Sequence, residues 1–217
     1  MNIDTLVRNN VKMMSSYSSA RDDYNGGANK NLIYLDANES PFKNEINRYP
    51  DNKHTEIKKL VSDIKNVNIN QVVFGNGTDE ILDLIVRVFC NPNKDKIITL
   101  PPTYGMYDII AKTNEVENIE IPLKSDFSID TEKILSLKMS NIKILFLCSP
   151  NNPTGNSFDT NELTDLIKGF NGIVVVDEAY IDFSSKQSLI SLINDNNNLI
   201  ITQTMSKAYG MAGIRLG

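Results

Sequence analysis

Five short segments of the sequence carry side chains that can do chemistry, and each follows an apolar run typical of a β-strand. They hold, in chain order, a glycine turn, an aromatic residue, an asparagine turn, a carboxylate, and a lysine with an arginine. The segments are residues 75–80, 101–107, 149–155, 177–180 and 204–217. Ligands of parallel α/β sheets gather at the carboxyl ends of the strands. We therefore expect these segments to form one site.

The first segment, Gly75-Asn76-Gly77-Thr78-Asp79-Glu80, opens directly into a helical pattern. Its glycines let the backbone turn tightly and approach a ligand. The free N–H groups of the first helical turn, together with the helix dipole, then favour an anion. The alternative is an ordinary helix N-cap by Thr78 or Asp79, and a short G-x-G motif alone does not decide between them.

The next two segments offer a flat ring and a positioned amide. Tyr104 falls where an aromatic face can stack on a heterocycle, although a core or surface tyrosine is the alternative. In Ser149-Pro150-Asn151-Asn152-Pro153-Thr154-Gly155, two prolines and a glycine specify a rigid turn. An asparagine held in that turn donates a hydrogen bond at a defined point.

The last two segments carry opposite charges. Asp177 ends a strand whose five preceding residues are apolar or glycine, so its carboxylate is costly unless it meets a cation. The alternative is an aspartate that caps the next turn. Lys207 lies among small residues and glycines, unlike a solvated lysine on a charged helix, and Arg215 follows eight positions later.

One cofactor, pyridoxal phosphate, needs this whole set. It requires a lysine to hold its aldehyde as a Schiff base and an acid beside its pyridine nitrogen. It also requires a donor near its phenolic oxygen, a group stacked on its ring, and donors for its phosphate. The lysine amine then moves a proton from the substrate α-carbon, for which a pKa lowered towards neutrality is needed. We predict no metal site.

The elements that position these residues alternate along the chain. We expect helices over residues 55–66, 79–89, 105–111, 131–138 and 159–170, and strands over residues 71–74, 96–100, 116–123, 143–148, 172–177 and 199–203. Asp130 and the Asp159–Glu162 pair mark two helix starts. Short apolar strands separated by helices indicate an α/β fold, with a parallel sheet covered on both faces.

Composition narrows the class of protein. The net charge of −5 over 217 residues argues against a nucleic-acid or anionic-membrane partner. No apolar run reaches the roughly 18 residues of a membrane span, and MNIDTLVRNNVKMM lacks the apolar region of a signal peptide. Cys90 and Cys148 lie in apolar surroundings, which favours core positions in a reduced compartment over a disulfide. We expect a cytoplasmic globular protein.

From about Val7 to Gly217 the sequence closely resembles the fold-type I, class I/II aminotransferases, and among them the histidinol-phosphate aminotransferases. SPNNPTG, VVVDEAY and SKAYGMAGIRLG are typical of the large family, and YSSARDDY, LDANESPF and NRYPD of the histidinol-phosphate branch. The resemblance implies a three-layer α/β/α domain, a homodimer and a role in histidine biosynthesis. The implied reaction is amino transfer between histidinol phosphate and 2-oxoglutarate, giving imidazole-acetol phosphate and glutamate.

The resemblance also implies residue roles. Lys207 would be the Schiff-base lysine and proton shuttle, and Asp177 would pair with the pyridinium nitrogen. The remaining cofactor contacts would come from Tyr180 and Asn152 at the phenolic oxygen, Tyr104 on the ring, and Thr78, Asp79, Ser206 and Arg215 at the phosphate. Tyr49 would reach the phosphate of the neighbouring subunit's cofactor, and Tyr17 and Asn38 would line the substrate pocket. His54 matches nothing catalytic and is predicted to lie at the surface.

The resemblance divides the chain into an N-terminal arm, residues 1–45, and a partial pyridoxal-phosphate-binding large domain, residues 46–217. Family members continue through the rest of this domain and a C-terminal small domain, which carry arginines for the acidic groups of the substrates. Without them a sheet edge and an apolar face would be exposed. We therefore expect the 217 residues to bind cofactor poorly and to be inactive unless another segment completes them.

Three other functions compete. A threonine-phosphate decarboxylase or an aromatic aminotransferase would keep every cofactor residue, although Tyr17 and Arg21 favour histidinol phosphate. A non-catalytic remnant is disfavoured by the intact Lys207, Asp177 and Arg215, whereas the expected truncation favours it. A dinucleotide-binding domain fails, because no third glycine follows Gly75-Asn76-Gly77 at the required spacing and no acidic residue ends the next strand.

Overall fold

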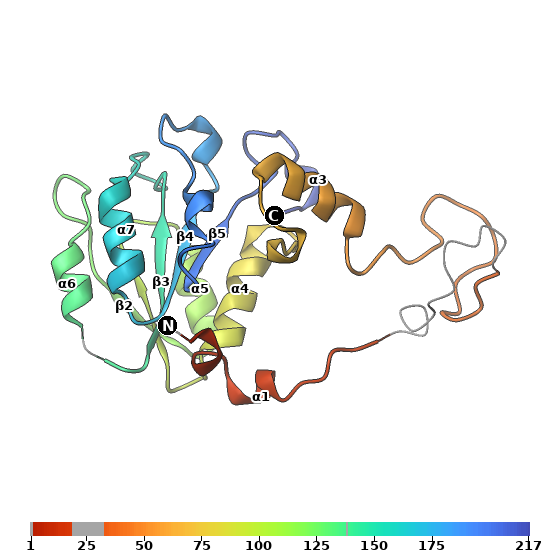
Figure 1. The fold of residues 1–217 in the computed structure, drawn as a ribbon, viewed down its shortest axis with the longest axis horizontal. Helices are drawn as coiled ribbons and strands as arrows, with labels where there is room; N and C mark the ends of the chain where they lie inside the picture. The colour runs from red at the N-terminus through yellow and green to blue at the C-terminus, as the bar shows by residue number, and fades with distance from the viewer. Residues whose placement is uncertain (1, 19–32, 138) are drawn as a thin grey trace. The chain divides into compact units, whose positions relative to one another are not determined.

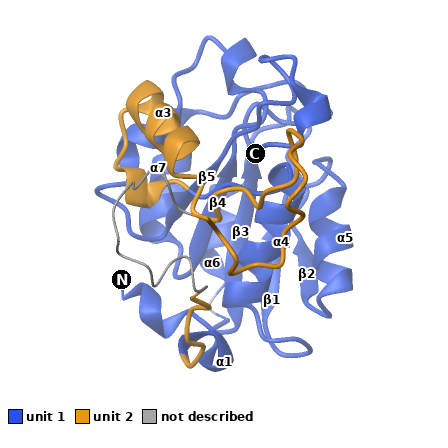
Figure 2. Cartoon of the chain, turned by 90° about the vertical axis from the view of Figure 1, so that its right-hand side faces the viewer, with its two compact units in different colours: residues 1–12, 73–217 blue, residues 13–72 orange. Residues whose placement is uncertain are grey.

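The structure is a computed structural model that describes residues 2–18, 33–137 and 139–217. The chain divides into two compact units (Figure 2). Unit 1 contains residues 1–12 and 73–217, and unit 2 contains residues 13–72. Arg21 and most of the YSSARDDY motif lie outside the described residues.

Unit 1 is built on a parallel sheet. Its strands are β1 (Lys96–Thr99), β2 (Glu117–Glu120), β3 (Ile142–Cys148), β4 (Ile173–Asp177) and β5 (Leu199–Thr202). They lie in the order β2-β1-β3-β4-β5, and every neighbouring pair is parallel. The predicted strands at these five places are confirmed.

Helices cover both faces of this sheet (Figure 1). One face packs against α4 (Thr78–Phe89) and α5 (Met106–Thr113), and the other against α6 (Thr131–Ser136) and α7 (Thr160–Gly169). Successive strand residues point to opposite faces, so Phe146 of β3 joins the α4–α5 core while Leu145 joins the α6–α7 core. The predicted three-layer α/β/α fold is confirmed.

Two predicted helix starts are confirmed by their caps. The Asp130 carboxylate accepts a hydrogen bond from the Lys133 N–H at 3.1 Å, at the start of α6. The Asp159 carboxylate accepts from the N–H groups of Asn161 and Glu162 at 2.8 and 3.4 Å, at the start of α7. Both bonds satisfy N–H groups that have no partner within the helix.

The strand predicted over residues 71–74 is wrong. Gln71 ends a short 3-10 helix, Ile69–Gln71, and the three residues after it belong to no strand. Within the described ranges, this part of the chain pairs with 215–217 only at its end, through an antiparallel bridge between Asn76 and Leu216. A four-residue apolar run has extended propensity, but it becomes a strand only when a neighbour accepts its backbone hydrogen bonds.

The first residues of the chain pack on unit 1. Ile3, Leu6 and Val7 lie against the α4–α5 core. The backbone N–H of Arg8 donates to the carbonyl of Val88 at 3.0 Å, and its guanidinium donates to the carbonyl of Arg87 at 2.8 Å. These bonds satisfy carbonyl groups at the end of α4, where the helix leaves them unpaired. Short helices Ile3–Thr5 and α1 (Asn9–Lys12) complete this segment.

Unit 2 contains α3 (Thr55–Lys65), as the spacing of its apolar residues predicts. The Asp51 carboxylate accepts from the N–H of Thr55 at 2.8 Å, and this bond, with those from the Thr55 hydroxyl and the Lys53 N–H, lowers the pKa of Asp51 to about 2. Leu60 and Ile64 of α3 remain exposed. His54 is exposed as predicted.

Further short 3-10 helices span Ile181–Phe183, Leu189–Leu192 and Ala212–Ile214. Cys90 and Cys148 are free and buried, which confirms their predicted core positions. None of the helices in the described ranges combines the length and apolarity that crossing a bilayer requires.

Candidate active site

The buried carboxylate of Asp177 lies at the end of β4. The Tyr107 hydroxyl donates to its Oδ2 at 2.8 Å, and the Thr202 hydroxyl and the Ala179 N–H donate to its Oδ1 at 3.1 and 3.2 Å. Burial raises the pKa of Asp177, and the three donors oppose this effect. The bond from the Ala179 N–H shows that Asp177 also caps the next turn, as the alternative interpretation of this residue predicted. All three partners are neutral, so a cationic ligand at this carboxylate would offset the cost of burying it.

Two tyrosines lie edge to face beside this carboxylate. The rings of Tyr104 and Tyr107 have centroids 5.6 Å apart at 87°, and Tyr107 stacks on Phe146 at 4.8 Å and 6°. The Tyr104 hydroxyl donates to Asp79 Oδ1 at 3.0 Å. Burial, followed by this bond, raises the pKa of Tyr104 to about 12. The half-buried Tyr104 ring is therefore held in place and stays protonated.

The start of α4 fits an anion. Gly77, not Thr78 or Asp79, is the residue before the helix, and it provides no side-chain cap. Its φ is +80°, and a Cβ added there would lie 2.6 Å from Nη2 of Arg215. The guanidinium thus closes over the glycine turn beside the unpaired N–H groups of the first helical turn. A guanidinium next to a helix N-terminus is a phosphate-binding arrangement.

The end of β5 leads into the lysine. The hydroxyl of Thr78 donates to the carbonyl of Gln203 at 3.3 Å, which joins the start of α4 to this strand end. The N–H of Ser206 donates to Thr204 Oγ1 at 3.1 Å. Lys207 follows on an exposed turn, and its Nζ lies 5.5 Å from the centroid of the Tyr180 ring. An ammonium group over a tyrosine face is a favourable cation–π contact.

The asparagine turn is held by a residue that the sequence analysis missed. Asn151 is 3% exposed, and its amide accepts from Thr103 Oγ1 at 3.0 Å and donates to the Pro102 carbonyl at 2.9 Å. These bonds tie the segment after β3 to the segment after β1. The predicted Asn152 lies next to this anchor and is half-buried. Two adjacent asparagines give no sequence signal that separates their roles.

Three of the predicted site residues belong to unit 2. Tyr17 is 88% exposed and Tyr49 is 69% exposed. Asn38 is also exposed and has a φ of 53°. Their roles toward the cofactor and the substrate stay predictions.

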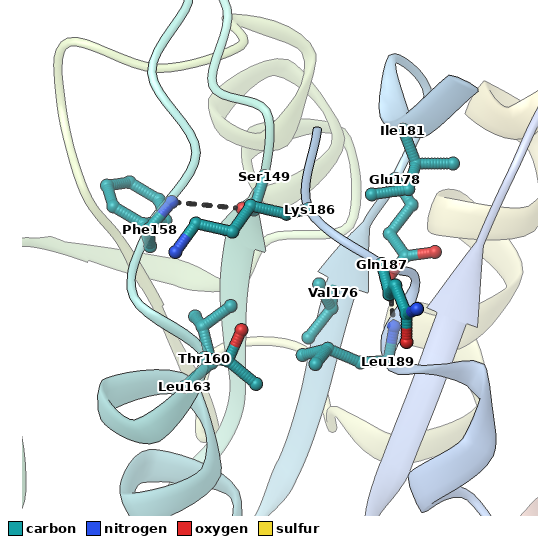
Figure 3. Close-up of a pocket in the computed structure, with 10 residues that line it drawn as sticks. All are labelled: Ser149, Phe158, Thr160, Leu163, Val176, Glu178, Ile181, Lys186, Gln187 and Leu189. Carbon is teal, nitrogen blue, oxygen red and sulfur yellow. Dashed lines mark hydrogen bonds between the residues drawn. The ribbon is translucent and has the colours of Figure 1, made fainter. Parts of the chain in front are cut away.

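A separate cleft lies on the α6–α7 face of the sheet (Figure 3). In it the Glu178 carboxylate accepts from the Leu189 N–H at 2.8 Å, and the Ser149 hydroxyl accepts from the Phe158 N–H at 3.2 Å. Its lining residues are Ser149, Phe158, Thr160, Leu163, Val176, Glu178, Ile181, Lys186, Gln187 and Leu189. None of the predicted site residues is among them, so the cleft is no part of the candidate site.

Comparisons with known proteins match the chain to one family. A family model described as aminotransferase class I and II matches residues 23–217. The histidinol-phosphate aminotransferase of Flavobacterium johnsoniae is 54% identical over 215 residues, which are 99% of this chain and 62% of that protein. The enzyme of the same name from Bacteroides thetaiotaomicron is 44% identical with the same coverage. The chain therefore spans about three fifths of the length of these relatives.

Solved structures give the same fold. The histidinol-phosphate aminotransferase of Clostridium acetobutylicum has a TM-score of 0.69 at 28% identity, over 78% of this chain and 51% of that one. The Sinorhizobium meliloti enzyme, solved in complex with pyridoxal 5′-phosphate, has a TM-score of 0.71 at 23% identity, over 78% and 47% of the two chains. The second likeness concerns the fold alone. Together they confirm the predicted fold class.

Proposed function

The chain belongs to the class I and II aminotransferase family, and from this premise we propose that it is the cofactor-binding part of a transaminase for histidinol phosphate in histidine biosynthesis. We propose 2-oxoglutarate as the amino acceptor, with imidazole-acetol phosphate and glutamate as products. The observation that carries this proposal is identity of 44–54% to histidinol-phosphate aminotransferases over nearly the whole chain.

The residues of unit 1 fit pyridoxal phosphate. When bound, this cofactor supplies an electron sink for bond cleavage at the substrate α-carbon. Asp177 would hold the pyridine nitrogen, because its buried carboxylate has only neutral donors and gains from a cation. Arg215 and the turn at Gly77 would hold the phosphate, since a Cβ there would meet the guanidinium. Further contacts would come from Tyr104 at the ring, Asn152 and Tyr180 at the phenolic oxygen, and Thr78, Asp79 and Ser206 at the phosphate.

Lys207 would carry the proton. Its amine lies on an exposed turn over the Tyr180 ring, which gives the side chain a resting position. From there the amine can accept the α-proton of the substrate and return it to the product. Tyr180 would thus hold the lysine through its ring and the cofactor's phenolic oxygen through its hydroxyl.

We also propose a cytoplasmic homodimer in which Tyr49 reaches the phosphate site of the second copy. Unit 2 presents large apolar side chains to solvent, and exposed apolar surface of this kind marks interaction sites. They are Ile33, Leu35, Phe42, Ile46 and Tyr49. Mixing Tyr49→Phe chains with Lys207→Ala chains tests whether Tyr49 acts in the site of the second copy. Half-active hybrids are expected if Tyr49 acts across the interface, and hybrids as inactive as both parents would refute it.

The decisive experiment is covalent trapping. The full chain is incubated with pyridoxal phosphate, reduced with borohydride and mapped by peptide mass spectrometry, and glutamate formation from histidinol phosphate and 2-oxoglutarate is measured in parallel. We expect the label on Lys207, its loss in Lys207→Ala, and its retention in Lys168→Ala, an exposed lysine at the end of α7. A label on another lysine in place of Lys207 would refute the cofactor assignment.

The same assay separates the competing functions. Faster turnover of threonine phosphate or phenylalanine than of histidinol phosphate would favour the decarboxylase or the aromatic aminotransferase. A trapped Lys207 without turnover of any donor would identify a cofactor-binding chain that another segment must complete. Complementation of a histidine auxotroph with this chain alone tests that last case in vivo.

A further inference from the structure

Among the described residues, the buried Tyr107 supplies the hydroxyl that contacts Oδ2 of Asp177, and no motif in the sequence assigns it a role. It lies on α5, 70 positions before the carboxylate, and its hydroxyl donates to Oδ2 at 2.8 Å. The other two donors, Thr202 and Ala179, bind Oδ1. Each carboxylate oxygen therefore has its own anchor, from different elements of the fold.

The Tyr107 ring has little freedom to move. It is 1% exposed, stacks on Phe146 with an interplanar angle of 6°, and meets the edge of Tyr104 at 87°. Burial, followed by the nearby Asp177 charge, raises the pKa of Tyr107 well above its ordinary value. Both effects favour the protonated phenol, which donates its hydrogen bond to the carboxylate.

We propose that Tyr107 is a positioning residue that fixes the Asp177 carboxylate in the orientation and charge state needed to pair with the cofactor's ring nitrogen. The inference rests on the proposed function, because it assigns that nitrogen to Asp177. A hydrogen bond to the ionised carboxylate favours the ionised form, whereas burial disfavours it. Tyr107 thus keeps the carboxylate available as an anion in a site that would otherwise favour the neutral acid.

The titratable groups that interact with Asp177 are Tyr104, Tyr107, Cys148 and Asp79. Tyr107 lies on α5, Cys148 on β3, and Asp79 at the start of α4. Burial raises the pKa of Cys148 to about 12, so this thiol stays neutral. The Asp79 carboxylate raises the pKa of Asp177 through charge repulsion. Tyr107 is the buried side-chain donor that opposes it on Oδ2.

The test is the titration of Asp177 in cofactor-free full chain, followed by carboxyl NMR and assigned with Asp177→Asn. Tyr107→Phe keeps the ring stack on Phe146 and removes only the hydroxyl, so the pKa of Asp177 should rise. Replacing Tyr107 with 3-fluorotyrosine makes the phenol a stronger donor, so the pKa should fall. The opposite shifts keep the test decisive if one of the two proteins folds poorly.

Cofactor affinity is the second readout. Loss of one hydrogen bond to a charged group should raise the Kd for pyridoxal phosphate about tenfold or more in Tyr107→Phe. Ile97→Val, a fully buried change in the same α4–α5 core, is the control for a merely structural effect and should leave the pKa of Asp177 in place. An unmoved pKa in both Tyr107 proteins, or a moved pKa with unchanged Kd, would overturn the inference. Trapping on Lys207 would still stand in either case, so the proposed function is tested separately.

Discussion

The proposed phosphate site can be tested with a single added methyl group. Gly77 has φ +80° and ψ 165°, a conformation that is essentially restricted to glycine. In Gly77→Ala the new Cβ would lie 2.6 Å from Arg215 Nη2, whereas ordinary contacts begin at 3.4 Å. The guanidinium is the free end of a flexible side chain, so it moves rather than the backbone. The clash therefore weakens ligand binding, whereas the strained φ lowers the stability of the folded protein.

The two effects have separate magnitudes. Forcing alanine into this conformation should cost about 1–3 kcal/mol of stability. Displacing one charged donor from the phosphate should cost about 1.5–3 kcal/mol of binding, or roughly 10- to 150-fold in Kd. Gly155→Ala is the matched control, because Gly155 has φ +75° and open space within 4 Å of the added Cβ. Both variants should be less stable than the wild type, and only Gly77→Ala should bind pyridoxal phosphate more weakly.

The assay compares pyridoxal phosphate with pyridoxal, which lacks the phosphate. Binding is followed by absorbance or by quenching of protein fluorescence, and stability by urea unfolding. In Gly77→Ala the affinity loss should appear for pyridoxal phosphate and vanish for pyridoxal. An equal loss for both ligands, or an equal loss in Gly155→Ala, would refute the placement of the phosphate at Gly77 and Arg215.

Three further predictions concern the core. Burial raises the pKa of Asp177, so its contribution to stability is present below the unfolded pKa, near about 4, and is lost as the pH rises through the folded pKa. Cofactor-free Asp177→Asn should therefore melt above the wild type at pH 7 and match it below about pH 4, and a pH-independent difference would contradict this. Leu166→Ala, at a fully buried α7 position, should cost about 2–5 kcal/mol in urea unfolding, and a loss near zero would show that the α6–α7 core is not packed as described. Burial raises the pKa of Cys90 and of Cys148 to about 12, so at pH 8 iodoacetamide should label both only after unfolding, as mass spectrometry of the native protein would show.

The arrangement of layers could be predicted because it depends on local patterns. Apolar runs such as 144–148 and 173–176 indicate strands buried on both faces, and these lie in β3 and β4. Residues 71–74 show the same composition and form no strand, since pairing depends on a neighbour that lies far away in the sequence. Composition thus predicts which residues can adopt an extended conformation, but not which of them pair with a neighbouring strand.

The residues of the candidate site also fall into those that the sequence indicates and those that only the fold reveals. Asp177 could be singled out because a carboxylate after an apolar strand is costly without a partner, and Lys207 and Arg215 because they lie among small residues and glycines. Asn151 and Tyr107 could not, because an asparagine beside another asparagine and a tyrosine in a helical pattern are both ordinary. Their importance comes from partners 48 and 70 positions away, Thr103 and Asp177. Only the folded chain brings these pairs within hydrogen-bond distance.

The separation of charges in the site has a physical consequence for the proposed function. Had Lys207 paired with Asp177, each would have neutralised the other, and a buried ion pair of this kind is costly to break. Instead the lysine lies over the Tyr180 ring, and the aspartate is held by hydroxyl and N–H donors. Neutral donors stabilise the carboxylate without cancelling its charge, so it keeps its attraction for an incoming cation. The amine, in turn, stays free to react. On this reasoning, a basic residue introduced beside Asp177 would stabilise the cofactor-free chain and weaken cofactor binding at the same time.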